Sequence, residues 1–227
     1  MIIIKPKVNV PINELSDDIL RKIERYGRVC YKSEGMMEKS NANHFIKSKL
    51  ELGHESIIEH EKATVMFIVD RGISHEIVRH RIAAYSQEST RYCNYSKDKF
   101  GNEITVIEPF FFIGKPAYEN WKESCQCAEK NYLKMLDLGC SPQEARSILP
   151  NSLKTEIVVT YNFREWRHFF KLRCSPAAHP QMRQVAIPLL LLFKDKIPVL
   201  FDDIEYDLSF SKEHFADIYQ TDSFFNN

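Results

Sequence analysis

Glycine is scarce in this chain, with only seven among 227 residues, and no stretch is rich in glycine. The P-loop and the Rossmann fingerprint both require closely spaced glycines, which let the backbone approach a phosphate group. Neither motif occurs here. Any nucleotide or dinucleotide that this chain binds must therefore be held by side chains and helix ends.

A surplus of charge of either sign is also missing, because Lys and Arg together number 31 and Asp and Glu together number 31. Dedicated nucleic-acid binders usually carry a basic surplus. The balance therefore argues against nucleic acid as a partner. It leaves room for a local basic pocket that binds a small anion.

Long apolar runs are absent as well. The most apolar run, residues 187–193, is far shorter than a bilayer-spanning helix, and a C-terminal core helix explains it. Residues 1–10 alternate like a strand and lack the apolar region of a secretory signal. We expect a cytoplasmic protein with no membrane partner.

The six cysteines form no zinc-binding pattern, since a single residue separates Cys125 from Cys127 and no second pair follows. In a chain of this length the spacing does not indicate a disulfide framework. We therefore expect free thiols in a reducing compartment and no metal, and we interpret Cys174 as a core residue.

Apolar periodicity and capping residues predict a mixture of helices and strands. The expected strands cover residues 2–10, 63–70, 104–108 and 153–161, and the expected helices cover residues 17–31, 41–52, 72–84, 116–138, 142–149, 163–173 and 181–196. The order has no regular βαβ rhythm, and no linker-like stretch divides the chain. We predict an α+β fold, with a mixed or antiparallel sheet packed against helices, in a single domain over residues 1–227.

Three consecutive basic residues, Arg79, His80 and Arg81, end the predicted helix 72–84. On a helix they point about 100° apart, in three directions. A site shared between subunits suits that arrangement, because each side chain then faces a different ligand or chain. The alternative is a solvated basic helix.

Farther along, Gln87, Ser89 and Arg91 alternate, so an extended loop places all three on one side. An amide, a hydroxyl and a guanidinium together can hold the carbonyls of a pyrimidine and a phosphate, which Arg binds with two hydrogen bonds. The alternative is an ordinary polar loop. By the same alternation, Glu88 points away from the other three.

The signature of the flavin-dependent thymidylate synthases resembles this segment: Arg-His-Arg, seven residues and then Ser, here residues 79–89, with Arg91 and Tyr92 following. The resemblance implies the family's fold and its reaction, the reductive methylation of dUMP to dTMP. It implies 5,10-methylenetetrahydrofolate as the carbon donor and FAD, reduced by NADPH, as the hydride source. It also implies a homotetramer whose sites are built between chains.

A second motif lies before the signature, in residues 53–60, with the sequence Gly-His-Glu-Ser-Ile-Ile-Glu-His. It matches neither of two zinc-protease motifs, because Ile58 and Ser56 stand where those motifs need histidine. The family carries a similar segment, in which the first His lies near the folate and flavin chemistry and the Ser and Glu contact flavin. The resemblance implies these roles for His54, Ser56 and Glu59. The alternative for Ser56 and Glu59 is a capping box.

On the predicted helix 163–173, Phe163, Trp166 and Phe170 form a core-facing stripe that Arg173 continues. An arginine that closes a buried stripe needs an anionic or carbonyl partner.

Arg164, Arg167 and His168 share another face of the same helix. In the family, the Arg at the first of these positions and the residue at the last approach flavin. A solvated helical face is the alternative for Arg164 and Arg167.

The resemblance assigns roles to the following residues of this chain. It implies dUMP binding by Glu76, Arg79, Gln87, Ser89, Arg91, Arg146 and Arg173, FAD binding by Ser56, Glu59, Arg79, His80, Arg81, Ile82, Asn162, Arg164 and His168, and catalytic roles for Arg173 and His54. Within that set, Arg146 reaches the nucleotide phosphate and Arg173 contacts the uracil ring. Alone, Arg146 would be a surface arginine.

At two positions, Gln87 and Ser89, the roles that the family implies do not carry over directly to this chain. The family's common form has Asn-Glu where this chain has Ser86-Gln87, which leaves open whether Gln87 takes over a carboxylate's role. Ser89 has no evident paired base, so we assign it to substrate binding rather than to nucleophilic attack. A rival function from another class is a non-catalytic nucleotide- or RNA-binding regulatory protein that uses the Arg and His cluster.

Overall fold

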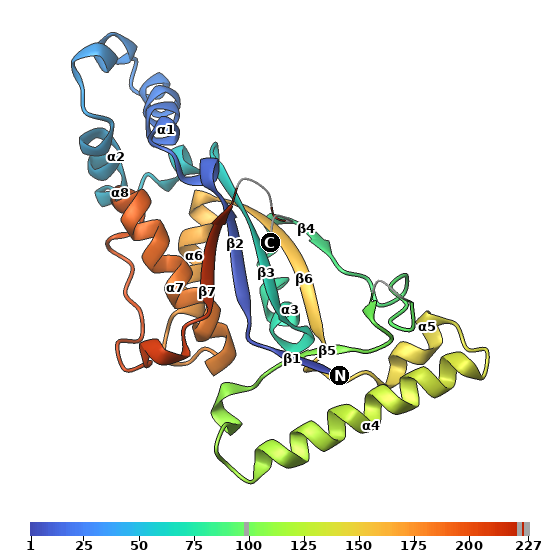
Figure 1. Ribbon diagram of the computed structural model, residues 1–227. Coiled ribbons are helices and arrows are strands. Elements are labelled where there is room, and N and C mark those ends of the chain that lie inside the picture. Colours follow the sequence, from blue (N-terminus) through green and yellow to red (C-terminus); the bar gives the residue numbers. More distant parts are fainter. Residues whose placement is uncertain (98–99, 222–223, 225–227) are drawn as a thin grey trace. The chain divides into compact units, whose positions relative to one another are not determined.

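Figure 1 shows the computed structural model of the chain, which describes residues 1–97, 100–221 and 224. The chain forms two compact units. Unit 1 consists of Met1–Lys7, Phe67–Arg79 and Ser86–Ile157, and unit 2 consists of Val8–Met66, His80–Tyr85 and Val158–Asn227. The prediction of a single domain stays a prediction.

Unit 1 is built around a long amphipathic helix. Its elements are β1 (Ile2–Ile4), α3 (Arg71–Ile77), β5 (Thr105–Ile107), η5 (Phe110–Phe112), α4 (Ala117–Asp137), α5 (Pro142–Ala145) and η6 (Arg146–Ile148). The strands β1 and β5 pair in parallel, with Ile3 opposite Val106. Tyr132 and Cys125 of α4 pack into a core with Tyr95 and Val106. Burial of this apolar surface holds unit 1 together.

Unit 2 contains most of the helices. Its elements are β2 (Lys7–Pro11), η1 (Ile12–Leu15), α1 (Asp17–Val29), η2 (Glu34–Lys39), α2 (Ala42–Glu51), η3 (Glu55–Glu59), α6 (Phe163–Arg173), α7 (Pro180–Lys196), α8 (Pro198–Phe201), η7 (Lys212–His214) and β7 (Asp217–Thr221). Its core is aromatic: Phe163, Trp166 and Phe170 of α6 pack with Phe193 of α7 and Phe201 of α8. The stripe predicted for residues 163–173 is therefore confirmed as core-facing.

A five-stranded sheet runs in the order β4-β6-β3-β2-β7, with β4 at Ala83–Gln87, β6 at Lys154–Asn162 and β3 at Lys62–Asp70. Together with the helices it confirms the predicted α+β class. The predicted bounds of α6 agree with the structure, and those of α1, α2, β3, α4 and α7 agree to within two residues.

The predicted helix 72–84 is wrong beyond Ile77, where α3 ends. Residues 83–87 form β4 instead, which is hydrogen-bonded to β6 in the sheet. Strand pairing with a segment about 70 residues away outweighs the local helical pattern, as tertiary contacts often do. The three basic residues are consequently not helical, and His80 is buried whereas Arg79 and Arg81 are exposed.

The predicted strand 2–10 is interrupted at Lys5 and Pro6, where neither β1 nor β2 continues. Proline has no N–H to donate to a strand ladder. The two pieces then join different sheets, β1 with β5 and β2 with β3 and β7.

Cys174 is fully buried, which confirms its interpretation as a core residue, and burial raises the pKa of its thiol. All six cysteines are free thiols, as expected from their spacing. Within the described residues, no helix combines the length and the apolar character that a membrane crossing needs.

Candidate functional site

A cavity of about 470 Å³ lies in unit 2, where η3 and the start of α6 meet the segment that follows His80. Its lining consists of Glu55, Glu59, Ile82, Asn162, Arg164, Glu165, Arg167, His168 and Lys171. Five of these residues, Glu59, Ile82, Asn162, Arg164 and His168, belong to the predicted flavin set. The structure thus brings together residues from three separate sequence motifs.

The first turn of α6 fixes the position of several lining residues. Asn162 is the N-cap of α6, and its Oδ1 accepts a hydrogen bond of 2.9 Å from the backbone N–H of Glu165. An N-cap of this kind satisfies a donor that the helix leaves unpaired. Asn162 therefore has a structural role in addition to any role toward a ligand.

Two carboxylates hold Arg164 at the cavity wall. Its Nε lies 3.3 Å from Oε2 of Glu55, and its terminal nitrogen donates to Glu59. The hydrogen bond with Glu59 raises the pKa of the guanidinium. More than half of the Arg164 side chain is exposed, and exposed ion pairs contribute little to stability. Arg164 can therefore exchange these partners for a ligand anion at small cost.

Arg167 has a different environment, because its side chain is only 5% exposed. It donates to both carboxylate oxygens of Asp203, at 2.7 and 2.6 Å, and to the carbonyl of Leu200. The hydrogen bond from Arg167 lowers the pKa of the Asp203 carboxyl. The interpretation of Arg167 as part of a solvated face is thus wrong. Its Nε is buried without a hydrogen-bond partner and lies 3.6 Å from Oε1 of Glu55.

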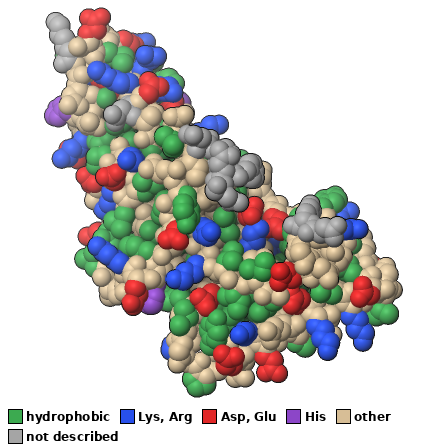
Figure 2. Space-filling view, in the orientation of Figure 1, with side chains coloured by type: hydrophobic (Ala, Val, Ile, Leu, Met, Phe, Trp, Pro, Cys, Tyr) green, Lys and Arg blue, Asp and Glu red, His purple; other side chains and the backbone are tan. Residues whose placement is uncertain are grey.

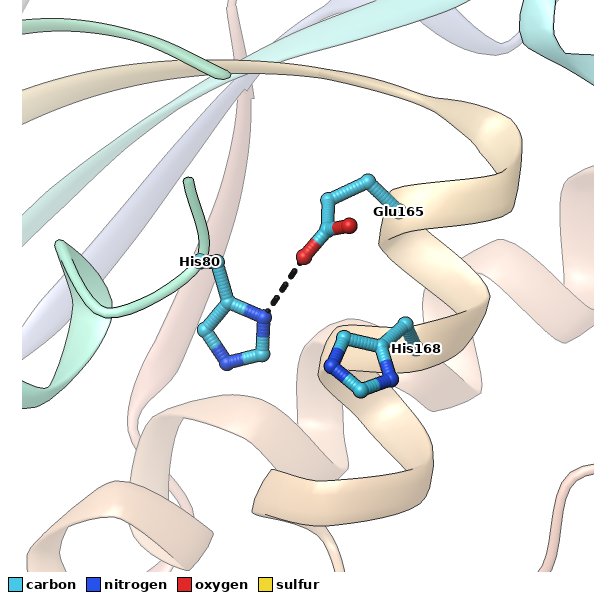
Figure 3. Close-up of side chains that lie close together, drawn as sticks. All are labelled: His80, Glu165 and His168. Atoms are coloured by element: carbon cyan, nitrogen blue, oxygen red, sulfur yellow. Dashed lines mark hydrogen bonds and ion pairs between the residues drawn. The ribbon is translucent and has the colours of Figure 1, made fainter. Parts of the chain in front are cut away.

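His80 lies between Glu165 and Arg173 in a chain of hydrogen bonds, and Figure 3 shows its contact with Glu165. Its Nδ1 is 2.8 Å from Oε1 of Glu165, and its Nε2 accepts from Nε of Arg173 at 3.2 Å. Burial lowers the pKa of the His80 imidazole, and the charge of Arg173 adds to that effect. We expected an anionic or carbonyl partner for Arg173, which stays a prediction, and among its contacts is the lone pair of His80.

The side chains of His80, Glu165 and His168 also form a group whose possible metal-ligand atoms all lie within 4.8 Å of one another. Both ring nitrogens of His80 already have hydrogen-bond partners. That arrangement favours a proton network over metal coordination at His80, because a ligating nitrogen must offer its lone pair to the ion. The expectation that the protein uses no metal stays a prediction.

In unit 1, Gln87 has partners on neighbouring elements. Its amide nitrogen donates to Ser74 at 2.8 Å and to Thr155 at 3.2 Å. Glu88 turns the other way, as expected from alternation, and accepts from Tyr95 and Lys154. The amide group of Gln87 is thus oriented by two hydroxyls, with no charge on the side chain.

Arg91 and Arg146 approach the same part of unit 1. Arg91 Nε donates to Gln143 of α5 at 3.1 Å, and Arg146 donates to Thr90 at 3.5 Å. Both guanidinium groups are exposed. The extended backbone stops before Thr90, so Arg91 lies in a turn rather than on the predicted extended loop. Ser89 accepts from the N–H of Arg91 within that turn, at 3.2 Å.

The other predicted residues lie outside the lining of the 470 Å³ cavity. Glu76 and Arg79 belong to unit 1, and Arg81 is exposed in unit 2. His54 and Ser56 are both exposed.

His54 is the N-cap residue of η3, and its Nδ1 is hydrogen-bonded to the hydroxyl of Tyr31. Ser56 lies inside η3, whose N-cap has no side-chain hydrogen bond, so the capping-box alternative is wrong.

Sequence reasoning missed Glu55, Glu165 and Lys171 as lining residues. Glu165 lies on the same side of α6 as His168 and Phe169, three and four positions later, and Phe169 is buried. A carboxylate four positions before a core-facing residue lies on the same side of the helix, and that spacing could have indicated that Glu165 is buried. Lys171 follows Arg164 by seven positions, the spacing that keeps two side chains on one face of a helix.

The chain is similar to known proteins along most of its length. The family model described as thymidylate synthase complementing protein, Thy1, matches residues 13–199. A flavin-dependent thymidylate synthase of Geobacter sulfurreducens is 36% identical over 183 residues, which is 78% of each chain. A protein of the same name from Corynebacterium aurimucosum is 31% identical over 86% of this chain and 84% of its own.

Among solved structures, a UMP/dUMP methylase, PolB, from Streptomyces cacaoi, bound with 5-Br dUMP, superposes with a TM-score of 0.72. The superposition covers 89% of this chain and 96% of the other, at 17% sequence identity, and shows a shared fold.

The fold and these matches define an enzyme of the methyltransferase type. The chain belongs to the Thy1 family, whose curated members are named flavin-dependent thymidylate synthases.

Proposed function

We propose that the protein is a flavin-dependent thymidylate synthase that methylates dUMP to dTMP. In this proposal 5,10-methylenetetrahydrofolate donates the carbon and NADPH is the reductant. The observation that carries the proposal is the cavity of unit 2, because its wall collects five residues that the signature and its flanking motifs assign to flavin. No single motif brings these residues together in sequence.

The chemistry of the lining suits FAD. The cationic groups of Arg164 and Lys171 match a diphosphate, and Nε of Arg167, which has no hydrogen-bond partner, is a buried donor beside the cavity. The amide of Asn162 supplies polar contacts and Ile82 supplies an apolar one. When bound and reduced, the flavin supplies the hydride for the reaction.

The nucleotide is expected in unit 1. Arg91, in the turn 89–92, donates to Gln143 of α5, and Arg146, in η6, donates to Thr90 of the same turn. The two guanidinium groups therefore lie in the same part of unit 1, which supports binding of one phosphate by both arginines. The oriented amide of Gln87 offers hydrogen bonds to a pyrimidine edge. Ser89 keeps the binding role, because its hydroxyl accepts from the backbone of Arg91.

Arg173 of unit 2 is expected to donate to the uracil ring and to stabilise negative charge that develops there. His54 remains a candidate for the folate and flavin chemistry, since it is exposed on η3 next to Tyr31. We further propose a cytoplasmic homotetramer with sites shared between chains. Exposed apolar side chains such as Leu208, Tyr92 and Ile82, each at least 68% exposed, support burial in an assembly.

A spectrum of the purified protein tests the proposal first. We expect a yellow protein, or one that turns yellow on uptake of added FAD, which NADPH bleaches without oxygen in the presence of dUMP. Chromatography should then detect dTMP only when methylenetetrahydrofolate is present. Arg164→Met should weaken uptake of FAD, whereas Arg25→Met, an exposed arginine of α1 away from the cavity, should not.

A folded but colourless preparation that takes up no FAD would refute the proposal. The rival interpretation as an RNA-binding regulatory protein predicts such a preparation, together with salt-sensitive binding to polynucleotides. The face in Figure 2 has basic side chains interspersed with acidic ones rather than gathered in one stripe, which gives that rival no support.

A further inference from the structure

The hydrogen-bonded residues Glu165, His80 and Arg173 all lie within unit 2. His80 is 3% exposed and Glu165 is 8% exposed, so bulk water does not compete for the hydrogen bond between them, whereas Arg173 is half-buried. In this series of hydrogen bonds, the chemistry of each side chain fixes which atom donates and which accepts.

Arginine supplies the first limit. A guanidinium only donates hydrogen bonds, so Nε2 of His80 must carry a lone pair toward Nε of Arg173. The proton of a neutral His80 then resides on Nδ1 and is donated to Glu165. The carboxylate and the guanidinium thus select the same one of the two histidine tautomers.

A protonated His80 would not fit this series of hydrogen bonds. Its Nε2–H would face an N–H of Arg173, so the hydrogen bond would be lost and two positive groups would meet. Besides Glu165 and Arg173, the titratable groups that face His80 are His168 of α6, Tyr161 of β6 and Tyr85, whose hydroxyl donates to the His80 carbonyl. Among the described residues, the carboxylate that contacts His80 is that of Glu165.

We propose that Glu165 and His80 are positioning residues for Arg173. Glu165 holds His80 in the tautomer whose Nε2 accepts, and that acceptor fixes the guanidinium of Arg173 for its contact with the uracil ring. The role of Arg173 toward uracil rests on the proposed function. The tautomer itself does not.

Two substitutions of His80 distinguish its hydrogen bond with Glu165 from its hydrogen bond with Arg173. The amide of Gln reaches the place of Nε2, whereas the shorter Asn places its amide near Nδ1. H80Q therefore keeps an acceptor for Arg173, and H80N keeps only the contact with Glu165. We expect kcat to fall by about 10- to 100-fold in H80N, as small misplacements of a reacting group do, and to be at least about fivefold higher in H80Q.

The carboxylate is tested by E165Q, with Glu205→Gln, an exposed residue, as the matched control. We expect E165Q to lower kcat by about tenfold or more while KM for dUMP changes by less than about threefold and the flavin spectrum is kept. In the wild type, kcat should also fall on the acidic side as His80 takes up a proton, and H80Q should lack that decline. Equal turnover in H80N and H80Q, or wild-type turnover in E165Q, would overturn the proposal.

A second measurement does not need activity. Nitrogen-15 NMR of histidine-labelled protein distinguishes a ring with its proton on Nδ1 from one with its proton on Nε2, and the His80 signal is the one lost in H80Q. We expect the Nδ1–H form in the wild type, and in E165Q a weaker hydrogen bond from Nδ1–H, because the amide oxygen of Gln is a neutral acceptor. If the wild type makes no dTMP but shows this tautomer, the proposed function fails, whereas the described hydrogen bonds among Glu165, His80 and Arg173 are confirmed. The opposite tautomer, or stoichiometric zinc binding that H168N removes, would overturn the proposal.

Discussion

Residues of one type, three positions apart on α6, have very different energetic roles. Arg164 is exposed and its partners are carboxylates at the cavity wall, whereas Arg167 is buried and bonded to Asp203 and Leu200. Exposed pairs contribute little, but loss of one partner from a buried pair leaves the other without compensation. Residue type and helical spacing alone do not distinguish the two arginines.

The first prediction compares these two arginines in stability. Arg167→Met should lower the free energy of unfolding by about 2 kcal/mol, below the usual range for buried pairs because Asp203 is 59% exposed. Arg164→Met should lower it by at most about 1 kcal/mol. Urea denaturation measures both, and equal losses would contradict the assignment of Arg167 as structural.

The second prediction concerns pH. Burial lowers the pKa of His80 in the folded protein, so the unfolded chain binds the proton more readily. The contribution of His80 is therefore complete above its ordinary pKa of about 6.5 and is lost as pH falls below that value. The slope is at most about 1.4 kcal/mol per pH unit.

Urea unfolding at several pH values between 8 and 5 should accordingly give a steeper loss of stability in the wild type than in H80Q. The other histidines contribute to both proteins, so the difference between the two slopes isolates His80. Identical slopes would mean that the imidazole titrates normally in the folded state.

At the scale of elements, close packing of α1 against α2 and η3 depends on a missing side chain. A Cβ added at Gly27 of α1 would lie 2.9 Å from the ring of Phe45 and 3.2 Å from Ile57. Glycine normally weakens a helix interior. Its presence here lets the aromatic ring of α2 approach the backbone of α1.

The third prediction follows from that contact. Gly27→Ala gains about 1 kcal/mol of helix propensity but must displace Phe45, and overpacking of this kind costs about 1 to 3 kcal/mol. We expect a net loss of about 1 kcal/mol in thermal or urea unfolding. Gly35→Ala is the matched control, because nothing lies within 4 Å of its added Cβ, and it should be nearly neutral. A stabilised G27A would contradict the packing described.

Elements were predictable from sequence where local pattern and tertiary environment agree. Helix 163–173 was predicted with correct bounds because its aromatic stripe meets the core and Asn162 caps it. Residues 83–87 were assigned to a helix because their pairing partner, β6, is far away in sequence. The short elements α8 and β7 were missed, since few residues and no clear periodicity mark them.

Site residues were likewise predictable where the local sequence carries the information, and were missed where a distant segment supplies the partner. Contiguous motifs indicated Glu59, Asn162 and Arg164, because each motif keeps its residues at fixed spacing. Glu165 was missed because its partner His80 comes from a segment 85 positions earlier. Folding alone brings those two side chains together.

At the scale of the whole molecule, the predicted ligand sets divide between the units. Glu76, Gln87, Ser89, Arg91 and Arg146 lie in unit 1, and most of the flavin set lies in unit 2 together with Arg173. The boundary falls inside the signature, since Arg79 belongs to unit 1 and His80 to unit 2.

The fourth prediction uses this division. Arg146→Met should weaken dUMP binding about tenfold, as expected for a charged hydrogen bond to phosphate, and leave FAD affinity unchanged. Arg164→Met should do the reverse. Calorimetry with dUMP and fluorescence titration with FAD measure the two affinities. If either variant weakens both ligands equally, the separate assignment of the two arginines fails.

The fifth prediction concerns assembly. If the sites are shared between chains, light scattering during gel filtration should give a mass about four times the 26.7 kDa of one chain. Ile82→Lys and Leu208→Lys introduce charge at exposed apolar positions and should reduce that mass if either side chain is covered in the assembly. A monomer that is fully active would rule out sharing.

The chain passes from one compact unit to the other five times, after Lys7, Met66, Arg79, Tyr85 and Ile157. No continuous stretch of the gene therefore encodes either unit completely. A single crossover therefore cannot exchange one whole unit between relatives. Specificity is therefore expected to change by point substitution rather than by the exchange of modules.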